Sequence, residues 1–274
     1  IKADPIAGTP SPVRVLVIYL DRGYNTGIKN SIVSAITGAG GIVDELMIPA
    51  GSNTGFYSYL VSAGYSLDDY CEVWDIRFND LNQGIAYMNS GVMYDDSITS
   101  GCPTCDAELL REFMINGGHV YLQGEHQNFY GRNESVLQFI ADVAGAVSYP
   151  GLITAAKTWN IFSSNPENFN TDFNTLTKVD TYYVGTILLS GVGNGRPVTT
   201  DGTNSLDIAF LPEDLYIGAG RLFVSFDTNM FDPGDAYWTA SAGEEYGYVQ
   251  NVYDFLSNCY KYSITKTVSD VDIC

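Results

Sequence analysis

The sequence places an acid directly before a histidine at a turn. Glu125 and His126 follow the apolar run 119–123, and a carboxylate beside an imidazole is a pair that can exchange protons with a substrate. Other strand-like runs also end in acids, at Asp21, Asp75 and Asp227. Parallel strands bring their carboxyl ends to one edge of a sheet, where open α/β sheets bind ligands. These side chains therefore define the first candidate site.

This edge has two interpretations. In an enzyme, Glu125, His126, Asp21 and Asp227 would converge in a polar cleft of a hydrolase or sugar-active enzyme, with or without a divalent cation. If this edge of the sheet has only a structural role, the acids would instead pair with arginines and stabilise helix N-termini through the helix dipole. We expect the structural role, because strand ends in α/β proteins are polar whether or not they catalyse a reaction.

A second cluster of oxygen ligands follows the last strand-like run. Its members are Asp227, Asn229, Asp232 and Asp235. Calcium prefers such ligands, but the spacing does not fit an EF-hand, and turns rich in Asp and Asn give the same pattern. The sequence therefore names calcium as a candidate ion and requires no cofactor. The glycines at 191–195 are followed by Arg196 and Pro197 rather than by a helix, so they do not form a phosphate-binding loop.

Composition limits the partners. The 274 residues include 13 Lys and Arg against 32 Asp and Glu, a formal net charge of −19, so a nucleic-acid-binding surface is excluded. The apolar run 15–20 is far shorter than the ~20 residues of a membrane helix, so we expect no membrane insertion. Copies with this charge repel one another at low salt, so any self-assembly would depend on salt or cations.

The cysteines are too few to build the fold on a framework of disulfides. Five cysteines occur, at Cys71, Cys102, Cys105, Cys259 and Cys274. The C-x-x-C pair has no second pair and no nearby histidine, which argues against zinc. Three arrangements stay open: a local disulfide between Cys102 and Cys105, two free thiols at these positions, and a disulfide between Cys259 and Cys274. Because Asn, Gly, Tyr, Ser and Thr are abundant, we expect an extracellular or cell-surface protein.

Apolar periodicity predicts alternating strands and helices. The expected strands are 14–20, 42–48, 72–78, 119–123 and 221–226, and the expected helices are 28–36, 56–63, 106–116, 134–144 and 249–256. Continuous apolar strands between helices indicate a three-layer, flavodoxin-like α/β domain with a parallel sheet. We assign an extended arm to 1–12, the domain to 13–262 and a tail to 263–274. Within the domain, 148–220 is expected to be a β-rich antiparallel insertion.

The segment Gly117-Gly-His-Val-Tyr-Leu-Gln-Gly-Glu-His126, with the helix-like run after Arg132, resembles the central elbow of the class I glutamine amidotransferase-like superfamily, including its ThuA-like branch. The closing run 220–229 and the helix after Asn251 resemble the last strand and helix of that superfamily. The resemblance covers most of 13–262 and implies the same fold.

Catalytic members of that superfamily carry a cysteine at the elbow and a histidine with a nearby glutamate much later in the chain. Here the elbow holds Gly124, Glu125 and His126, and the only other histidine is His119. The triad cannot be assembled from these residues. The resemblance therefore implies the fold without the catalytic residues.

The chain holds 20 Tyr and 13 Phe, and several of them, such as Tyr130 and Tyr149, fall in expected loops. Loop tyrosines suit a protein interface or a carbohydrate-binding face. We expect a non-catalytic extracellular structural module that associates with copies of itself through its arm, its tail and its aromatic loops. The alternatives are the hydrolase or sugar-active enzyme described above and a carbohydrate-binding module.

Overall fold

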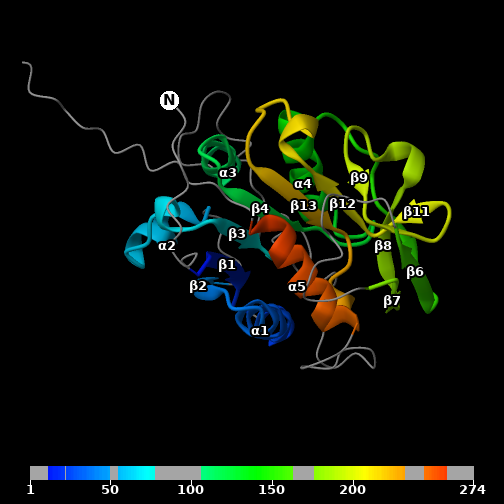
Figure 1. Cartoon of the computed structure of the whole chain (residues 1–274), viewed down its shortest axis with the longest axis horizontal. Coiled ribbons are helices and arrows are strands. Elements are labelled where there is room, and N and C mark those ends of the chain that lie inside the picture. The colour runs from blue at the N-terminus through cyan, green and yellow to red at the C-terminus, as the bar shows by residue number, and fades with distance from the viewer. Residues whose placement is uncertain are drawn as a thin grey trace, which may run out of the picture.

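The computed structural model describes residues 12–21, 23–49, 55–77, 106–162, 176–231 and 244–257 (Figure 1). The arm up to residue 11, the tail and the segment 78–105 lie outside these residues, as do Asp232 and Asp235. Arg22, the arginine next to Asp21 in the sequence, also lies outside them.

A seven-stranded sheet forms the centre of the domain, in the order β2-β1-β3-β4-β13-β12-β9. Its strands are β1 (Arg14–Leu20), β2 (Ile42–Ile48), β3 (Glu72–Asp75), β4 (His119–Gln123), β9 (Arg196–Pro197), β12 (Asp207–Phe210) and β13 (Arg221–Ser225). The first five strands of that order are mutually parallel, as their apolar runs predict. The carboxyl ends of β1, β3, β4 and β13 consequently share one edge.

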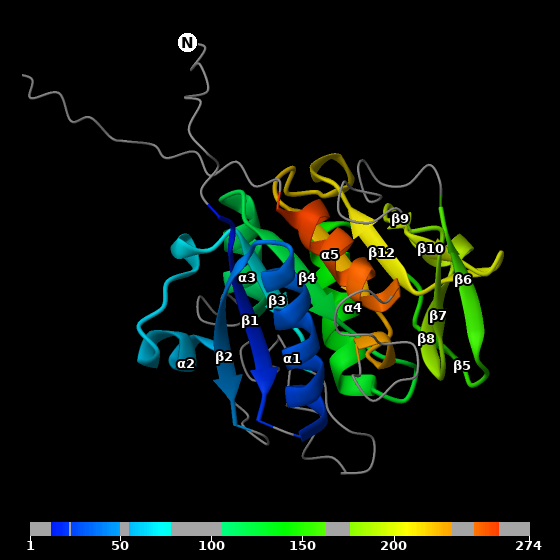
Figure 2. The same cartoon turned by 60° about the horizontal axis from the view of Figure 1, so that its bottom comes forward.

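Helices cover both faces of this sheet, which explains why the central strand β1 is apolar at nearly every position. The helices are α1 (Gly23–Gly38), α2 (Tyr57–Ser62), α3 (Asp106–Ile115), α4 (Tyr130–Val143) and α5 (Glu244–Leu256). Along β1, Val15 and Val17 belong to the core formed with α1 and α5, whereas Leu16 and Ile18 face the core formed with α2, α3 and α4. Figure 2 shows α1 and α5 in front of the sheet. The predicted three-layer α/β fold is confirmed.

Two helices begin earlier than the apolar spacing indicates. α1 begins at Gly23 rather than at residue 28, and α4 begins at Tyr130 rather than at residue 134. Both first turns are polar or aromatic, so they carry no apolar stripe. The early start of α4 places Asn133 inside the helix, fully buried, so Asn133 does not cap it, although the Asn at the start of the apolar run would suggest a cap. The only glycosylation sequon of the chain begins at this inaccessible side chain.

The β-rich segment is antiparallel, as predicted. Its strands outside the central sheet are β5 (Gly151–Ile153), β6 (Lys157–Ile161), β7 (Lys178–Thr181), β8 (Val184–Leu188), β10 (Thr199–Thr200) and β11 (Asn204–Ser205). Short 3-10 helices lie at η1 (Leu67–Asp69), η4 (Leu189–Gly191), η5 (Pro212–Asp214) and η6 (Asn229–Phe231). However, β12 pairs with β13 and β9 pairs with β12, so these two strands extend the central sheet and the segment is only partly a separate layer.

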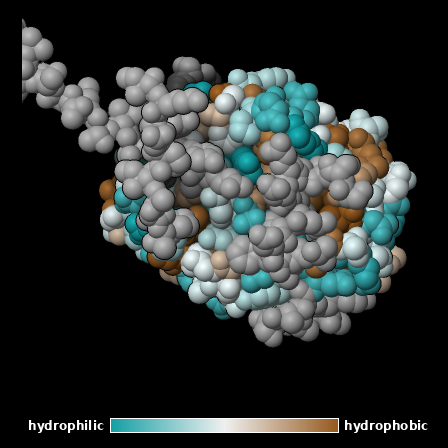
Figure 3. Space-filling model, viewed as in Figure 1, coloured by the Kyte–Doolittle hydropathy of each residue, from teal (hydrophilic) through white to brown (hydrophobic). Residues whose placement is uncertain are grey.

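The described surface is mixed in polarity. Figure 3 shows hydrophilic residues interrupted by separate hydrophobic areas on the face that it presents. In the described part of the chain, no helix combines the length and the hydropathy that crossing a bilayer requires.

Candidate functional site

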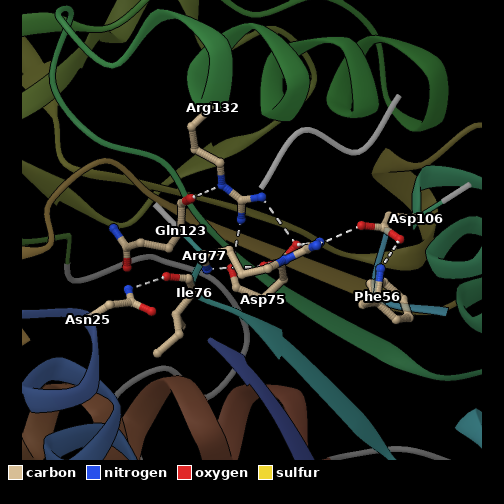
Figure 4. A network of polar contacts seen from close by, with 8 residues as sticks. All are labelled: Asn25, Phe56, Asp75, Ile76, Arg77, Asp106, Gln123 and Arg132. Carbon is tan, nitrogen blue, oxygen red and sulfur yellow. Dashed lines mark hydrogen bonds and ion pairs between the residues drawn. The ribbon is translucent and has the colours of Figure 1, made fainter. Parts of the chain in front are cut away.

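The chain reverses direction across the sheet at β1, because β2 lies on one side of β1 and β3 on the other. Such a switch point is where open α/β sheets bind ligands. Here Asn25, in the first turns of α1, fills it: its Oδ1 accepts a hydrogen bond from Leu20 N at 2.6 Å, and its Nδ2 donates to Ile76 O at 2.9 Å (Figure 4). The side chain is buried, so the ends of β1 and β3 are tied together.

A second polar group lies at the end of β3. Arg77 binds the Asp75 carboxylate with two hydrogen bonds, from Nε at 2.9 Å and from Nη2 at 2.8 Å, and its Nη1 lies 2.8 Å from Asp106 Oδ2. Arg132, from α4, approaches Asp75 from the other side, with 3.2 Å from Nη1 to Oδ2. Asp106 also accepts a hydrogen bond from Phe56 N at 2.7 Å. Figure 4 shows the two arginines converging on Asp75.

This Asp75 network is closed and balanced in charge. Its two acids and two arginines are at most 4 % exposed. Burial raises the pKa of Asp75, but the charges of Arg132 and Arg77 outweigh burial and lower that pKa to about 2. Each carboxylate oxygen of Asp75 has an arginine partner, as a buried ion pair needs. The network links β3, α3 and α4 and presents no free charge to a substrate.

The elbow between β4 and α4 is held by Asn133. Its Oδ1 accepts from Glu125 N at 2.9 Å, and its Nδ2 donates to Glu125 O at 2.8 Å and to His126 O at 2.9 Å. Gly124 is needed here, because a Cβ at this position would lie 2.7 Å from the Phe226 ring. Three hydrogen bonds from one buried side chain therefore fix the path of the elbow.

The Glu125 carboxylate is also bound within the protein. Its Oε1 accepts from His126 N at 2.8 Å, and its Oε2 accepts from Thr228 N at 3.2 Å and from the Thr228 hydroxyl. Burial raises the pKa of Glu125 to about 7, against these hydrogen bonds, which lower it. The carboxylate thus joins the end of β4 to the loop after β13, and both of its oxygens are engaged.

His126 lies between two aromatic rings. Phe129 and Tyr183 contact its ring edge-to-face, with centroid distances of 4.8 Å and 5.2 Å. Its Nδ1 accepts a hydrogen bond from Asn128 N at 3.4 Å. Burial lowers the pKa of His126 to about 4, so the imidazole is neutral at pH 7. His119, at the amino end of β4, instead contacts the Leu256 carbonyl, far from this edge.

The predicted enzyme residues do not form one open group. Glu125 and His126 are adjacent, and Asp227 precedes the threonine that binds Glu125; all three are at most 3 % exposed. Asp21 is exposed at the end of β1, which β3 separates from β4.

Of the predicted calcium ligands, the structure describes only the side chain of Asp227, which is fully buried at the end of β13. Asp232 and Asp235 lie outside the described residues. Within the described residues, no group of three or more His, Cys, Asp and Glu side chains is arranged to hold a metal ion.

A row of buried polar side chains crosses three strands just inside the edge. Gln123, Ser225 and Asp207 are register neighbours on β4, β13 and β12. Tyr121 donates to Gln123 Oε1 at 2.5 Å, and Tyr248, from α5, donates to Asp207 Oδ2 at 2.6 Å. Burial raises the pKa of Asp207 to about 6. The sequence carries a signal for this row, an acid and a serine inside apolar strands, which the sequence analysis missed.

Four exposed tyrosines surround the elbow. Tyr130 and Tyr149 stack with centroids 6.0 Å apart, Tyr182 and Tyr183 lie 6.3 Å apart, and the exposed fractions of the four run from 36 % to 54 %. The segment 126–130 joins the two pairs, through the contact between His126 and Tyr183 and a hydrogen bond from Tyr149 to Gln127 O. We call these four residues the tyrosine surface. Only the first pair was singled out from the sequence, because the second pair falls within a strand-like run of the expected β-rich insertion.

No protein-family model matches the sequence, and no curated protein is significantly similar to it. Among solved structures, the chain is similar to a ThuA-like protein from Parabacteroides merdae, with a TM-score of 0.53 and 12 % identity over 90 % of this chain and 91 % of the other. A ThuA-like protein from Bacteroides uniformis gives a TM-score of 0.40 and 8 % identity over 93 % and 94 % of the two chains. The first similarity shows that the fold is ThuA-like, and at this identity it shows the fold alone.

Proposed function

We propose that this chain is an extracellular, non-catalytic structural module that associates with copies of itself. The contrast at the carboxyl edge of the sheet carries the proposal. Glu125, the acid at the elbow, has both carboxylate oxygens bound within the protein, whereas the aromatic rings beside it are exposed. An elbow that engages both oxygens of its acid and exposes tyrosines is suited to recognition rather than to proton transfer.

We also infer that the chain is a member of the class I glutamine amidotransferase-like superfamily without its catalytic residues. The ThuA-like fold supports this assignment. At the elbow, where catalytic members carry the cysteine nucleophile, this chain has Glu125 beside Gly124 and His126. The carboxylate there stabilises the elbow instead of attacking a substrate.

The extracellular location is supported by the cysteines. Cys71 is disulfide-bonded, and the other four cysteines lie outside the described residues. Disulfides persist in oxidising surroundings and are rare in the reducing cytosol.

Self-association is proposed to use the arm at 1–12, the tail at 263–274 and the tyrosine surface. Tyrosines are enriched in protein interfaces because they bury a large apolar ring and keep a hydrogen-bonding hydroxyl. A net charge of −19 opposes contact between copies, so association is expected to strengthen with salt.

A hydrolase or sugar-active enzyme is the second candidate, because a Glu125 pKa of about 7 suits a general acid or base near neutral pH. The engagement of both carboxylate oxygens argues against this candidate.

Size-exclusion chromatography of the full chain and of a variant that lacks residues 1–12 tests the assembly. We expect the full chain to elute as an oligomer at high concentration and the shortened chain to elute later. A full chain that elutes as a monomer at the same concentration would contradict the proposal.

A further inference from the structure

We infer that His126 and the tyrosine surface form a binding site for a neutral pyranose saccharide. This inference goes beyond self-association and does not depend on it. It assigns a ligand class to the surface around the elbow, from the exposed rings, the remaining hydrogen-bonding atom of His126 and the charge of the chain.

The rings supply the apolar part of such a site. Tyr130 and Tyr149 are stacked at an interplanar angle of 28°, and both remain at least 39 % exposed. A pyranose ring has C–H faces and a rim of hydroxyls, and a tyrosine has a flat ring and a hydroxyl, so the two match face to face and edge to edge. A purely apolar partner would be better matched by aliphatic side chains, which this surface does not have among its four members.

His126 supplies the polar part. Because Asn128 N donates to Nδ1, the proton of the neutral imidazole lies on Nε2. Nε2 makes no hydrogen bond with any residue that the structure describes, and the side chain keeps a small exposed area of 3 %. A saccharide hydroxyl bound beside Tyr183 and Phe129 would accept this hydrogen bond.

The site is held in place before a ligand arrives. Tyr183 has a φ of 62°, and it is the one non-glycine residue with a positive φ in the described ranges. Two residues later, Gly185 packs so tightly that a Cβ there would lie 2.8 Å from His126 N and 2.3 Å from Phe226 O. This close approach packs β8 against the elbow and places the ring of Tyr183 in contact with His126. Strain of this kind persists where the surrounding structure enforces it, and preorganisation lowers the cost of binding.

Charge selects a neutral ligand. The net charge of −19 repels uronates, sulfated glycans and phosphates, and the segment 126–130 contains no Lys or Arg that could bind them. Neutral hexose and pentose polymers carry no such penalty. The predicted ligand class is therefore a neutral polysaccharide with exposed pyranose faces.

Pull-down of the full chain on insoluble cellulose, β-1,3-glucan, chitin and xylan, with heparin beads as the polyanion, tests the inference. We expect binding to at least one neutral polymer and none to heparin. The paired variant Tyr130→Ala/Tyr149→Ala should bind about tenfold more weakly or worse, a loss of about 1.4 kcal/mol. Tyr57→Ala is the matched control, because Tyr57 is 40 % exposed on α2. His126→Gln, which keeps an N–H donor, should retain more binding than His126→Ala.

Absence of binding to all four neutral polymers would overturn the inference, as would equal binding by the tyrosine variant and the control, or preferential binding to heparin. Sedimentation of the same samples separates this inference from the assembly proposal. A monomer that binds glycan contradicts assembly and leaves the site intact, whereas an oligomer that binds no glycan does the reverse.

Discussion

Asn133 binds both the amide and the carbonyl of Glu125, at 2.9 Å and 2.8 Å, although eight residues separate the two in the sequence. A single buried amide side chain thus takes over the hydrogen bonds that a backbone partner would supply in regular structure. The direction in which His126 and the rings beside it face depends on this bond pair.

Replacing Asn133 with Ala should therefore destabilise the protein. The change leaves Glu125 N without its partner and removes the donor to two buried carbonyls, each at a cost of about 1–3 kcal/mol. Urea unfolding measures the free energy, and Asn116→Ala, at an exposed position after α3, is the control. A variant as stable as this control would show that the elbow does not depend on Asn133.

Breaking the Asp75 network should cost more. Asp75→Asn leaves Arg77 and Arg132 buried with one acid, Asp106, and removal of one partner from a buried ion pair typically costs about 3–5 kcal/mol. Asp44→Asn, in the exposed pair with Arg14, should cost less than about 1 kcal/mol. Equal effects of the two substitutions in urea unfolding would mean that the network contributes no more than a surface pair.

Stability should fall as pH rises from about 6.5 to about 8. Burial raises the folded-state pKa values of Glu72, Glu125 and Asp207 to about 8, 7 and 6, above the values of an unfolded chain. A carboxyl group whose pKa is higher in the folded than in the unfolded chain contributes its full stabilisation when the pH is below its pKa in the unfolded chain. This contribution is lost as the pH rises through its pKa in the folded chain. Asp75 acts in the opposite sense: its pKa of about 2 gives stability that is lost only as pH falls from about 4 toward 2.

The melting temperature across pH 3 to 9 checks this dependence. Between about pH 4 and 6.5 the lowered pKa of His126 acts in the opposite sense, because the unfolded chain binds a proton that the buried imidazole does not, so the fall is expected to be clearest above pH 6.5. Glu72→Gln should flatten the fall at the alkaline end, because Glu72 has the highest of the three pKa values. A melting temperature that climbs steadily between pH 5 and pH 8 would contradict the assignment of these buried acids.

Much of the fold follows from the sequence. The run from Arg14 to Leu20 is apolar at nearly every position, and a strand covered on both faces accommodates that pattern. The sequence pattern alone could therefore place β1 and its parallel neighbours. The early start of α4 could not, because its first turn, Tyr130 to Asn133, buries polar groups against the elbow rather than an apolar stripe.

The site was predicted in its location and not in its arrangement. The acids at the strand ends do lie at the carboxyl edge, since parallel strands require it. Which acid meets which partner depends on contacts between distant segments, such as Thr228 with Glu125 and Arg132 with Asp75. Tyr182 and Tyr183 were missed because their exposure is set by the junction between β7 and β8, where Tyr183 leaves the extended conformation.

Glu125→Gln separates a structural from a catalytic role. Gln keeps the size of the side chain and one acceptor oxygen, and it removes the titrating proton. We expect the variant to associate and to bind saccharide as the parent chain does, with a melting temperature changed by only a few degrees. If instead the parent chain hydrolyses a glycoside or an ester and this variant does not, the edge is catalytic and the proposed function is wrong.

Sedimentation velocity of the full chain, over a range of protein concentrations and from about 0.02 to about 0.5 M salt, tests the proposed assembly most directly. The account predicts an oligomer whose fraction grows with concentration and with salt, because salt screens the repulsion between chains of charge −19. A monomer at every concentration and every salt level would contradict it.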